Sequence, residues 1–133
     1  MARILALDHG AARCGCAASD PSGTVVRPLG AVERPDTRRG MGEIERLVLA
    51  EEAERVLVGL PLTLSGAEGA QAEQARAFAD RLSRRLRVPV ELHDERLTTR
   101  QAARGPGDGN LDSRAAAHLL ESYLARNPEG TRG

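Results

Sequence analysis

The sequence predicts a single α/β domain built on a mixed five-stranded sheet with helices on both faces. Three short β-compatible segments, at residues 3–7, 13–19 and 24–32, follow one another with turn signals between them. After them, two segments with helical spacing of apolar residues alternate with two short apolar segments. Right-handed crossovers through these helices would place the last two strands parallel to the first strand.

The later elements each have a signal of their own. Residues 42–54 have apolar side chains near helical spacing, which predicts an amphipathic helix, and residues 55–61 read as a buried strand closed by proline. The clearest helical stripe lies in residues 70–87 and consists of Ala75, Phe78, Ala79, Leu82 and Leu86. The remaining expected elements are a strand at 88–92, a short helix at 98–104, a glycine-rich loop at 105–110 and a last helix at 111–126.

Length and composition restrict the possible functions. The 133 residues fit one domain, expected at 1–127, with a flexible tail at 128–133. No apolar stretch is long enough to span a membrane, so we expect a soluble, cytoplasmic protein, and the two cysteines, Cys14 and Cys16, are expected to be reduced core thiols. All basic residues are arginine, and 19 of them balance 19 acidic residues, so any nucleic-acid surface must be local.

Acidic residues stand where ligands collect in open α/β sheets, at the carboxyl ends of strands. Asp8 ends the first predicted strand, Asp94 and Glu95 follow the fifth, and Asp112 lies at the start of the last helix. Clustered carboxylates repel one another unless a cation lies among them, which predicts Mg²⁺ or Mn²⁺ and metal-assisted phosphodiester hydrolysis. The alternative is structural, because a lone acid is usually solvated, and Asp112 could cap its helix.

Four segments together resemble the YqgF/RuvX family. They are Asp8–Asp20 with the pattern Asp-x-Gly-x-x-Arg-x-Gly, the region 58–69, Asp94–Thr99, and Asp112–Leu124. The resemblance implies an RNase H-like fold with strand order 3-2-1-4-5. It also implies a metal-dependent nuclease, with maturation of the 5′ end of pre-16S rRNA and resolution of Holliday junctions as the activities proposed for the family.

Matching the family motif residue by residue implies that Asp8, Glu95 and Asp112 are the catalytic metal ligands. Asp94 stays open as the alternative to Glu95. Val90 and Leu92 share the parity of Asp94, which suggests that Asp94 follows the core side, but strands often bend at their ends.

Several polar residues close to these acids could bind the phosphates of a substrate. Arg13, Arg96, Arg100 and Thr98 are the candidates; the two arginines beside the acids, Arg13 and Arg96, could equally orient the carboxylates, and Thr98 could cap a short helix. The loop at 105–110 is short and has no arginine, which favours single-stranded RNA, with DNA possible, over a branched duplex. The sequence indicates no exposed apolar helix face that would form a dimer interface, so a monomer or weak dimer is expected.

Competing functions come from different classes. A Holliday junction resolvase is one alternative, and a non-catalytic nucleic-acid-binding module with the same fold is another. Actin-like ATPases and sugar kinases also begin with Asp-x-Gly, but they need two such domains around the nucleotide, and this length supplies one. His9 and His93 stand beside acidic residues, where they could assist water activation, although packing is the commoner role of such histidines.

Overall fold

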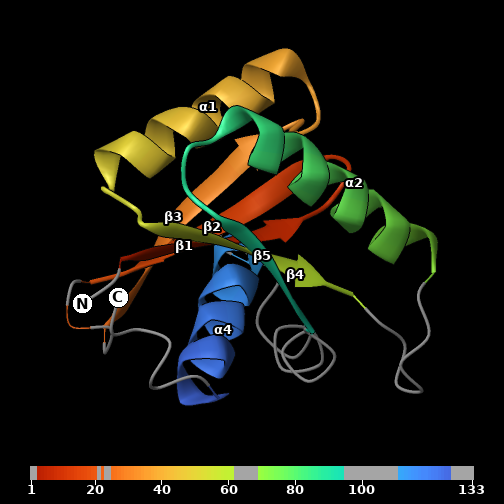
Figure 1. Ribbon diagram of the computed structural model, residues 1–133. Helices are drawn as coiled ribbons and strands as arrows, with labels where there is room; N and C mark the ends of the chain where they lie inside the picture. The colour runs from red at the N-terminus through yellow and green to blue at the C-terminus, as the bar shows by residue number, and fades with distance from the viewer. Residues whose placement is uncertain (1–2, 21, 23–24, 62–68, 95–110, 127–133) are drawn as a thin grey trace.

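The computed structural model describes residues 3–20, 22, 25–61, 69–94 and 111–126. In Figure 1 a twisted sheet forms the middle layer, with α1 and α2 above it and α4 below it. The described elements follow in the order β1 (Ile4–His9), β2 (Arg13–Ser19), β3 (Val26–Glu33), α1 (Arg38–Ala50), β4 (Arg55–Leu60), α2 (Ala70–Arg85), β5 (Val90–Asp94) and α4 (Leu111–Arg126). Among these helices, none has the length and apolar character needed to cross a membrane.

The sheet has five strands in the order β3-β2-β1-β4-β5, so the predicted mixed sheet and its strand order are confirmed. β1 pairs antiparallel with β2, and β2 pairs antiparallel with β3, which makes the predicted meander. β4 lies parallel to β1, and β5 lies parallel to β4. The carboxyl ends of β1, β4 and β5 therefore meet at one end of the sheet.

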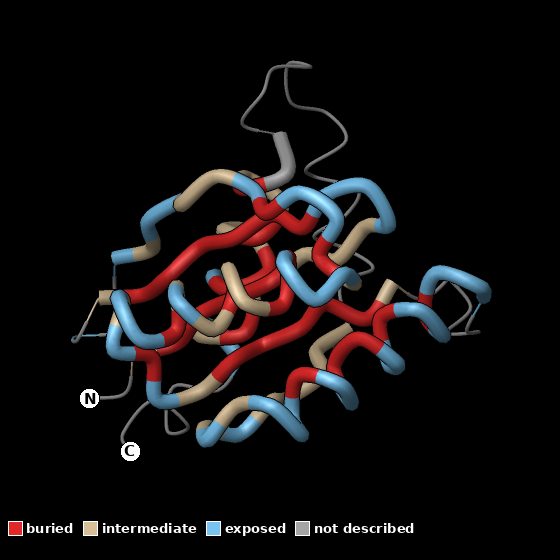
Figure 2. The backbone as a smooth tube through the Cα atoms, turned by 90° about the horizontal axis from the view of Figure 1, so that it is seen from above, coloured by how far each residue is buried: buried red, intermediate tan, exposed pale blue. Residues whose placement is uncertain are grey.

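Two hydrophobic cores lie on opposite faces of this sheet. Leu5 and Leu7 of β1 pack in the core beneath α1 and α2, whereas Ile4 and Ala6 pack against α4. Figure 2 shows the central strands as buried segments surrounded by helices whose outer faces are exposed. Successive side chains of a strand point to opposite faces, so this alternation divides the four apolar residues of β1 between the two cores.

Some element boundaries differ from the prediction. α1 begins at Arg38, four residues before the predicted start, because the Thr37 hydroxyl accepts a hydrogen bond from the Gly40 N–H (3.0 Å) and caps the first turn. It ends at Ala50, before Glu52 adopts a left-handed backbone with φ 55°. β5 occupies 90–94, two residues later than expected. The short helix predicted at 98–104 and the loop at 105–110 lie outside the described residues.

The two cysteines lie in β2 and are both free and buried, as expected for core thiols. Their sulfurs belong to the core under α1 and α2. A hydrogen bond with Cys16, together with burial, raises the pKa of Cys14 well above its ordinary value. Both side chains contribute packing, and the raised pKa of Cys14 disfavours its thiolate.

The exposed edge strand β3 is irregular. The register between β2 and β3 shifts at Cys16 and Ala17, which marks a bulge. β3 also contains Pro28, which has no N–H to donate, and Gly30, whose φ of 91° suits glycine. The edge at this side of the sheet therefore presents an interrupted row of hydrogen-bonding groups.

Two glycines at the start of α1 predict opposite effects of the same substitution. A Cβ at Gly40 would lie 2.2 Å from the Arg34 carbonyl oxygen, whereas at Gly42 its nearest neighbour would be the Arg85 guanidinium at 3.6 Å. We expect Gly40→Ala to lower the free energy of unfolding by about 2 kcal/mol or more through overpacking. Gly42→Ala should raise it by roughly 0.5–1 kcal/mol, because alanine is the better helix former.

Urea denaturation of both variants beside the unmodified chain measures these changes. Equal stability of the Gly40→Ala variant and the unmodified chain would contradict the prediction and show that the turn before α1 can shift at little cost in free energy.

Candidate active site

Asp8 lies at the carboxyl end of the central strand and is half-buried. It follows Ile4 and Ala6 in the alternation of β1, so it lies on the face covered by α4. Its partner in β2 is Gly15, and its neighbour on the β4 side is Gly59, which follows the Leu7–Val58 pair. Because neither glycine has a side chain, these two positions of the adjacent strands place no side chain beside the Asp8 carboxylate.

Asp94 lies on the other face of the sheet. It is paired with Leu60, and both Leu60 and Leu92 belong to or pack against the core under α1 and α2. The alternation of β5 therefore directs Asp94 away from the face of Asp8. This geometry argues against Asp94 as a partner of Asp8. Glu95, the preferred candidate, lies outside the described residues.

Asp112 is the second residue of α4, and its side chain is not described. The helix itself packs on the face of Asp8, where Leu119 and Leu120 contact the core formed with Ile4 and Ala6. The structure therefore brings the helix that carries Asp112 and the strand that carries Asp8 together on one face.

His93 lies on this same face, level with Gly59. Its Nε2 lies 3.4 Å from the Ser122 hydroxyl, and its ring meets the Tyr123 ring edge-on with centroids 5.5 Å apart. Burial, followed by the charge of Arg126, lowers the pKa of His93, which favours a neutral imidazole at neutral pH. His93 thus joins the end of β5 to α4.

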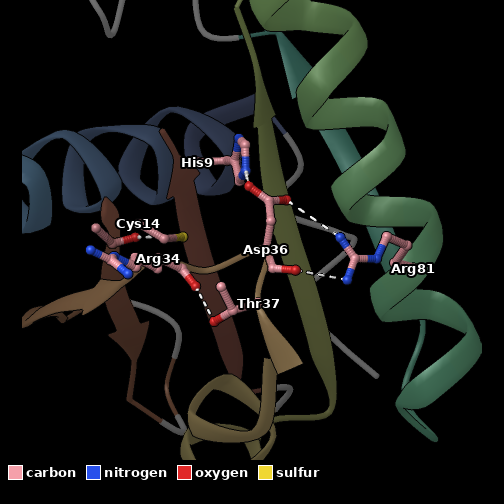
Figure 3. Close-up of polar contacts among 7 residues, drawn as sticks. His9, Cys14, Arg34, Asp36, Thr37 and Arg81 are labelled. Atoms are coloured by element: carbon pink, nitrogen blue, oxygen red, sulfur yellow. Dashed lines mark hydrogen bonds and ion pairs between the residues drawn. The ribbon is translucent and has the colours of Figure 1, made fainter. Parts of the chain in front are cut away.

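His9 lies on the opposite face from Asp8, in a polar cluster shown in Figure 3. Its side chain is 2% exposed, its Nε2 is 2.8 Å from Asp36 Oδ2, and its ring lies 4.4 Å from the Phe78 ring. Arg81 of α2 donates to the Asp36 carbonyl at 2.7 Å. This cluster ties the end of β1 to the turn before α1 and to α2, which is a packing role. The sequence contained no signal for Asp36.

The remaining predicted residues are placed only in part. Arg13 begins β2, is exposed, and stands opposite Glu33 of β3. Arg96, Thr98 and Arg100 lie outside the described residues. Among the side chains that the structure describes, no cluster of three or more histidine, cysteine, aspartate or glutamate residues could hold a metal ion. Of the three predicted ligands, Glu95 and the side chain of Asp112 are not among the described side chains.

Comparison with known proteins covers nearly the whole chain. Residues 2–126 match the RuvX family, which is described as Holliday junction resolvase. A protein of Thermobifida fusca is 54% identical over 140 residues, covering 90% of this chain and 85% of the relative. A protein of Chloroflexus aurantiacus is 42% identical over 130 residues, covering 91% and 85%. Both carry the name "Putative pre-16S rRNA nuclease".

Solved structures with the same fold include RuvC of Thermus thermophilus. It superposes with a TM-score of 0.57 at 17% identity, and the match covers 97% of each chain. The RuvC chain solved in complex with a Holliday junction substrate gives a TM-score of 0.59 with the same identity and coverage. At this identity the likeness establishes the fold, which is the RNase H-like fold expected from the sequence.

Proposed function

Because this chain belongs to the RuvX family, we propose that it is a nuclease that hydrolyses phosphodiester bonds with a divalent metal, Mg²⁺ or Mn²⁺. The observation that carries the proposal is the placement of Asp8. Its carboxylate stands at the carboxyl end of the central strand, between two glycine positions and on the face covered by α4. Ligands of open α/β sheets bind at this end.

The donor chemistry fits such a metal. Carboxylate oxygens are the hard ligands that Mg²⁺ and Mn²⁺ prefer, and Asp8, Glu95 and Asp112 would supply them. A bound divalent ion would lower the pKa of an attacking water and stabilise the charge on the leaving oxygen. Pairing of β1 with strands on both sides fixes the backbone of Asp8, so the chain itself supplies a carboxylate at a defined position.

RNA is the proposed substrate, and pre-16S rRNA in particular. The names of the relatives at 54% and 42% identity support this choice. Zero net charge provides no general attraction for duplexes, so a single strand guided by a few local arginines suits this chain better.

Holliday junction resolution is the second candidate function, favoured by the description of the matching family. Resolution of a junction requires two active sites related by two-fold symmetry and a broad basic surface for the duplex arms. The balanced charge of this chain argues against such a surface.

Substitution of the central carboxylate tests the proposed chemistry. We expect Asp8→Asn to reduce cleavage of labelled RNA at least about a hundred-fold, because it removes an anionic metal ligand while keeping the side-chain shape. EDTA should abolish cleavage by the unmodified chain, and added Mg²⁺ or Mn²⁺ should restore it. Unchanged thermal unfolding of the variant is the control. An unmodified chain that binds RNA but never cleaves it with either metal would identify a non-catalytic binding module.

The adjacent acids after β5 give a matched pair of variants. Asp94 lies on the face away from Asp8, so Asp94→Asn should lower the cleavage rate by less than about ten-fold. Glu95→Gln should lower it much more, by about a hundred-fold or beyond, if Glu95 is the metal ligand. Initial rates at saturating metal measure both effects. The reverse order would assign the site to Asp94.

The two candidate substrates can be compared directly. We expect faster cleavage of an unstructured RNA than of a four-way DNA junction of matched length, measured as initial rates at one salt concentration. The physical reason is that a single strand needs fewer phosphate contacts than the arms of a junction. Symmetric paired nicks in the junction, made faster than any cut in the RNA, would establish the resolvase function instead.

A further inference from the structure

Arg34 lies in the turn between β3 and α1 and has an unusual, firmly held backbone. Its φ of 47° is in the left-handed region, which residues with a side chain seldom adopt. Its N–H donates to the Ala12 carbonyl at 2.9 Å, and its own carbonyl accepts from the Thr37 N–H at 3.1 Å and the Thr37 hydroxyl at 2.7 Å. The Thr37 bond is visible in Figure 3. Strained conformations held this firmly are concentrated at functional sites.

The side chain of Arg34 is exposed, and its guanidinium points away from Asp36 in Figure 3. Within the described ranges it has no ion pair or side-chain hydrogen bond. Asp36, the nearby acid, is already engaged by His9 and Arg81. The turn therefore presents a positive charge that the surrounding described residues do not neutralise.

This arginine borders a hollow of about 410 Å³ between the β1–β2 hairpin and the start of α1. Its lining residues are Ala11, Ala12, Arg34, Asp36 and Thr37. Next to it, Arg38 and Arg39 occupy the first turn of α1, which contains no acidic residue. The helix dipole favours carboxylates in a first turn, so it does not explain these arginines. Arg39 also forms an exposed ion pair with Glu43 one turn later (3.8 Å), which leaves Arg38 as the arginine of this turn without that contact.

The hollow lies at the same end of the sheet as Asp8. Ala11 is three residues beyond Asp8 along the chain, a path of at most roughly 10 Å at about 3.3 Å per residue. A strand of nucleic acid spans such a distance within a few phosphates, at about 3.4 Å of axis each. Asp8 lies on the α4 face and the hollow on the α1 side, so a strand bound at Asp8 would pass around the carboxyl end of β1 to bring a phosphate to Arg34.

We propose that Arg34 binds a backbone phosphate of the nucleic-acid strand that enters the site at Asp8, and that Arg38 and Arg39 continue this surface. The proposal rests on the proposed nuclease function and adds a binding surface to it. The planar guanidinium forms two parallel hydrogen bonds to phosphate oxygens, independent of base sequence. The uncovered hollow beside it gives the strand room to approach.

Arg34→Gly is the decisive variant, because glycine removes the charge and also suits the left-handed backbone. Binding is measured by fluorescence anisotropy with a labelled, unstructured single-stranded RNA in EDTA at several salt concentrations, so that no cleavage occurs. We expect the Kd to rise about ten-fold and the slope of log K against log salt to decrease by about 0.7. The Tm should be equal to or higher than that of the unmodified chain.

Two matched variants act as controls. Arg87→Ala removes an exposed arginine just before β5, at the opposite end of the sheet, and should leave the Kd and the salt slope unchanged. Arg34→Lys keeps the charge and should keep the salt slope. An Arg34→Gly variant that binds as tightly as the unmodified chain, or an unmodified chain that does not bind RNA, would overturn the proposal.

Failure of this proposal and failure of the nuclease function give different results. Loss of RNA binding in Arg34→Gly, with no cleavage by the unmodified chain in Mg²⁺ or Mn²⁺, supports the surface and contradicts the nuclease. Cleavage by the unmodified chain, with binding that is insensitive to Arg34→Gly, contradicts the surface alone.

Discussion

Burial of β1 on both faces is the constraint on which the other features depend. Its side chains alternate between the core under α1 and α2 and the core under α4, so the hydrophobic pattern fixes its register. A slip of one residue would exchange Asp8 and His9. It would place a carboxylate against Phe78 and break the contact between His9 and Asp36. Packing of the apolar residues therefore also positions the acid on which the proposed chemistry depends.

Local patterns in the sequence were sufficient to predict the sheet, but they were weaker at element ends and at long-range contacts. Turn residues and alternation indicated the meander, and the parity of Val90 and Leu92 indicated the core side on which Asp94 lies. The first turn of α1 was not predicted, because its arginines add no apolar residue to the stripe that marks a helix. The pairing of His9 with Asp36 joins residues 27 positions apart, and only the folded chain brings them together. Glu95 remains a prediction, because its assignment rests on resemblance.

Although the net charge of the chain is zero, charged residues are distributed unevenly along α1 and just after it. Arginines occupy its first turn, while Glu51, Glu52 and Glu54 follow its last turn. Glu51 and Glu52 pair with Arg27 and Arg3, at 2.6 Å and 3.1 Å. Exposed pairs of this kind add little stability, but they neutralise charge locally. The end of α1 near the β1–β2 hairpin is thus the basic end, and in the proposed binding mode this polarity would direct a phosphate chain toward this end of the sheet and away from the opposite end of the helix.

The interrupted edge at β3 bears on how copies of this chain behave at high concentration. A regular edge strand is a template for another strand, and chains that add to it in succession grow into fibrils. Here a proline lacks a donor, a glycine turns the backbone, and the bulge at Leu29 of β3 increases the local twist. Growth by strand addition at this side would leave hydrogen-bonding groups without partners. The same irregularities that shape this edge therefore disfavour the addition of a further strand at β3.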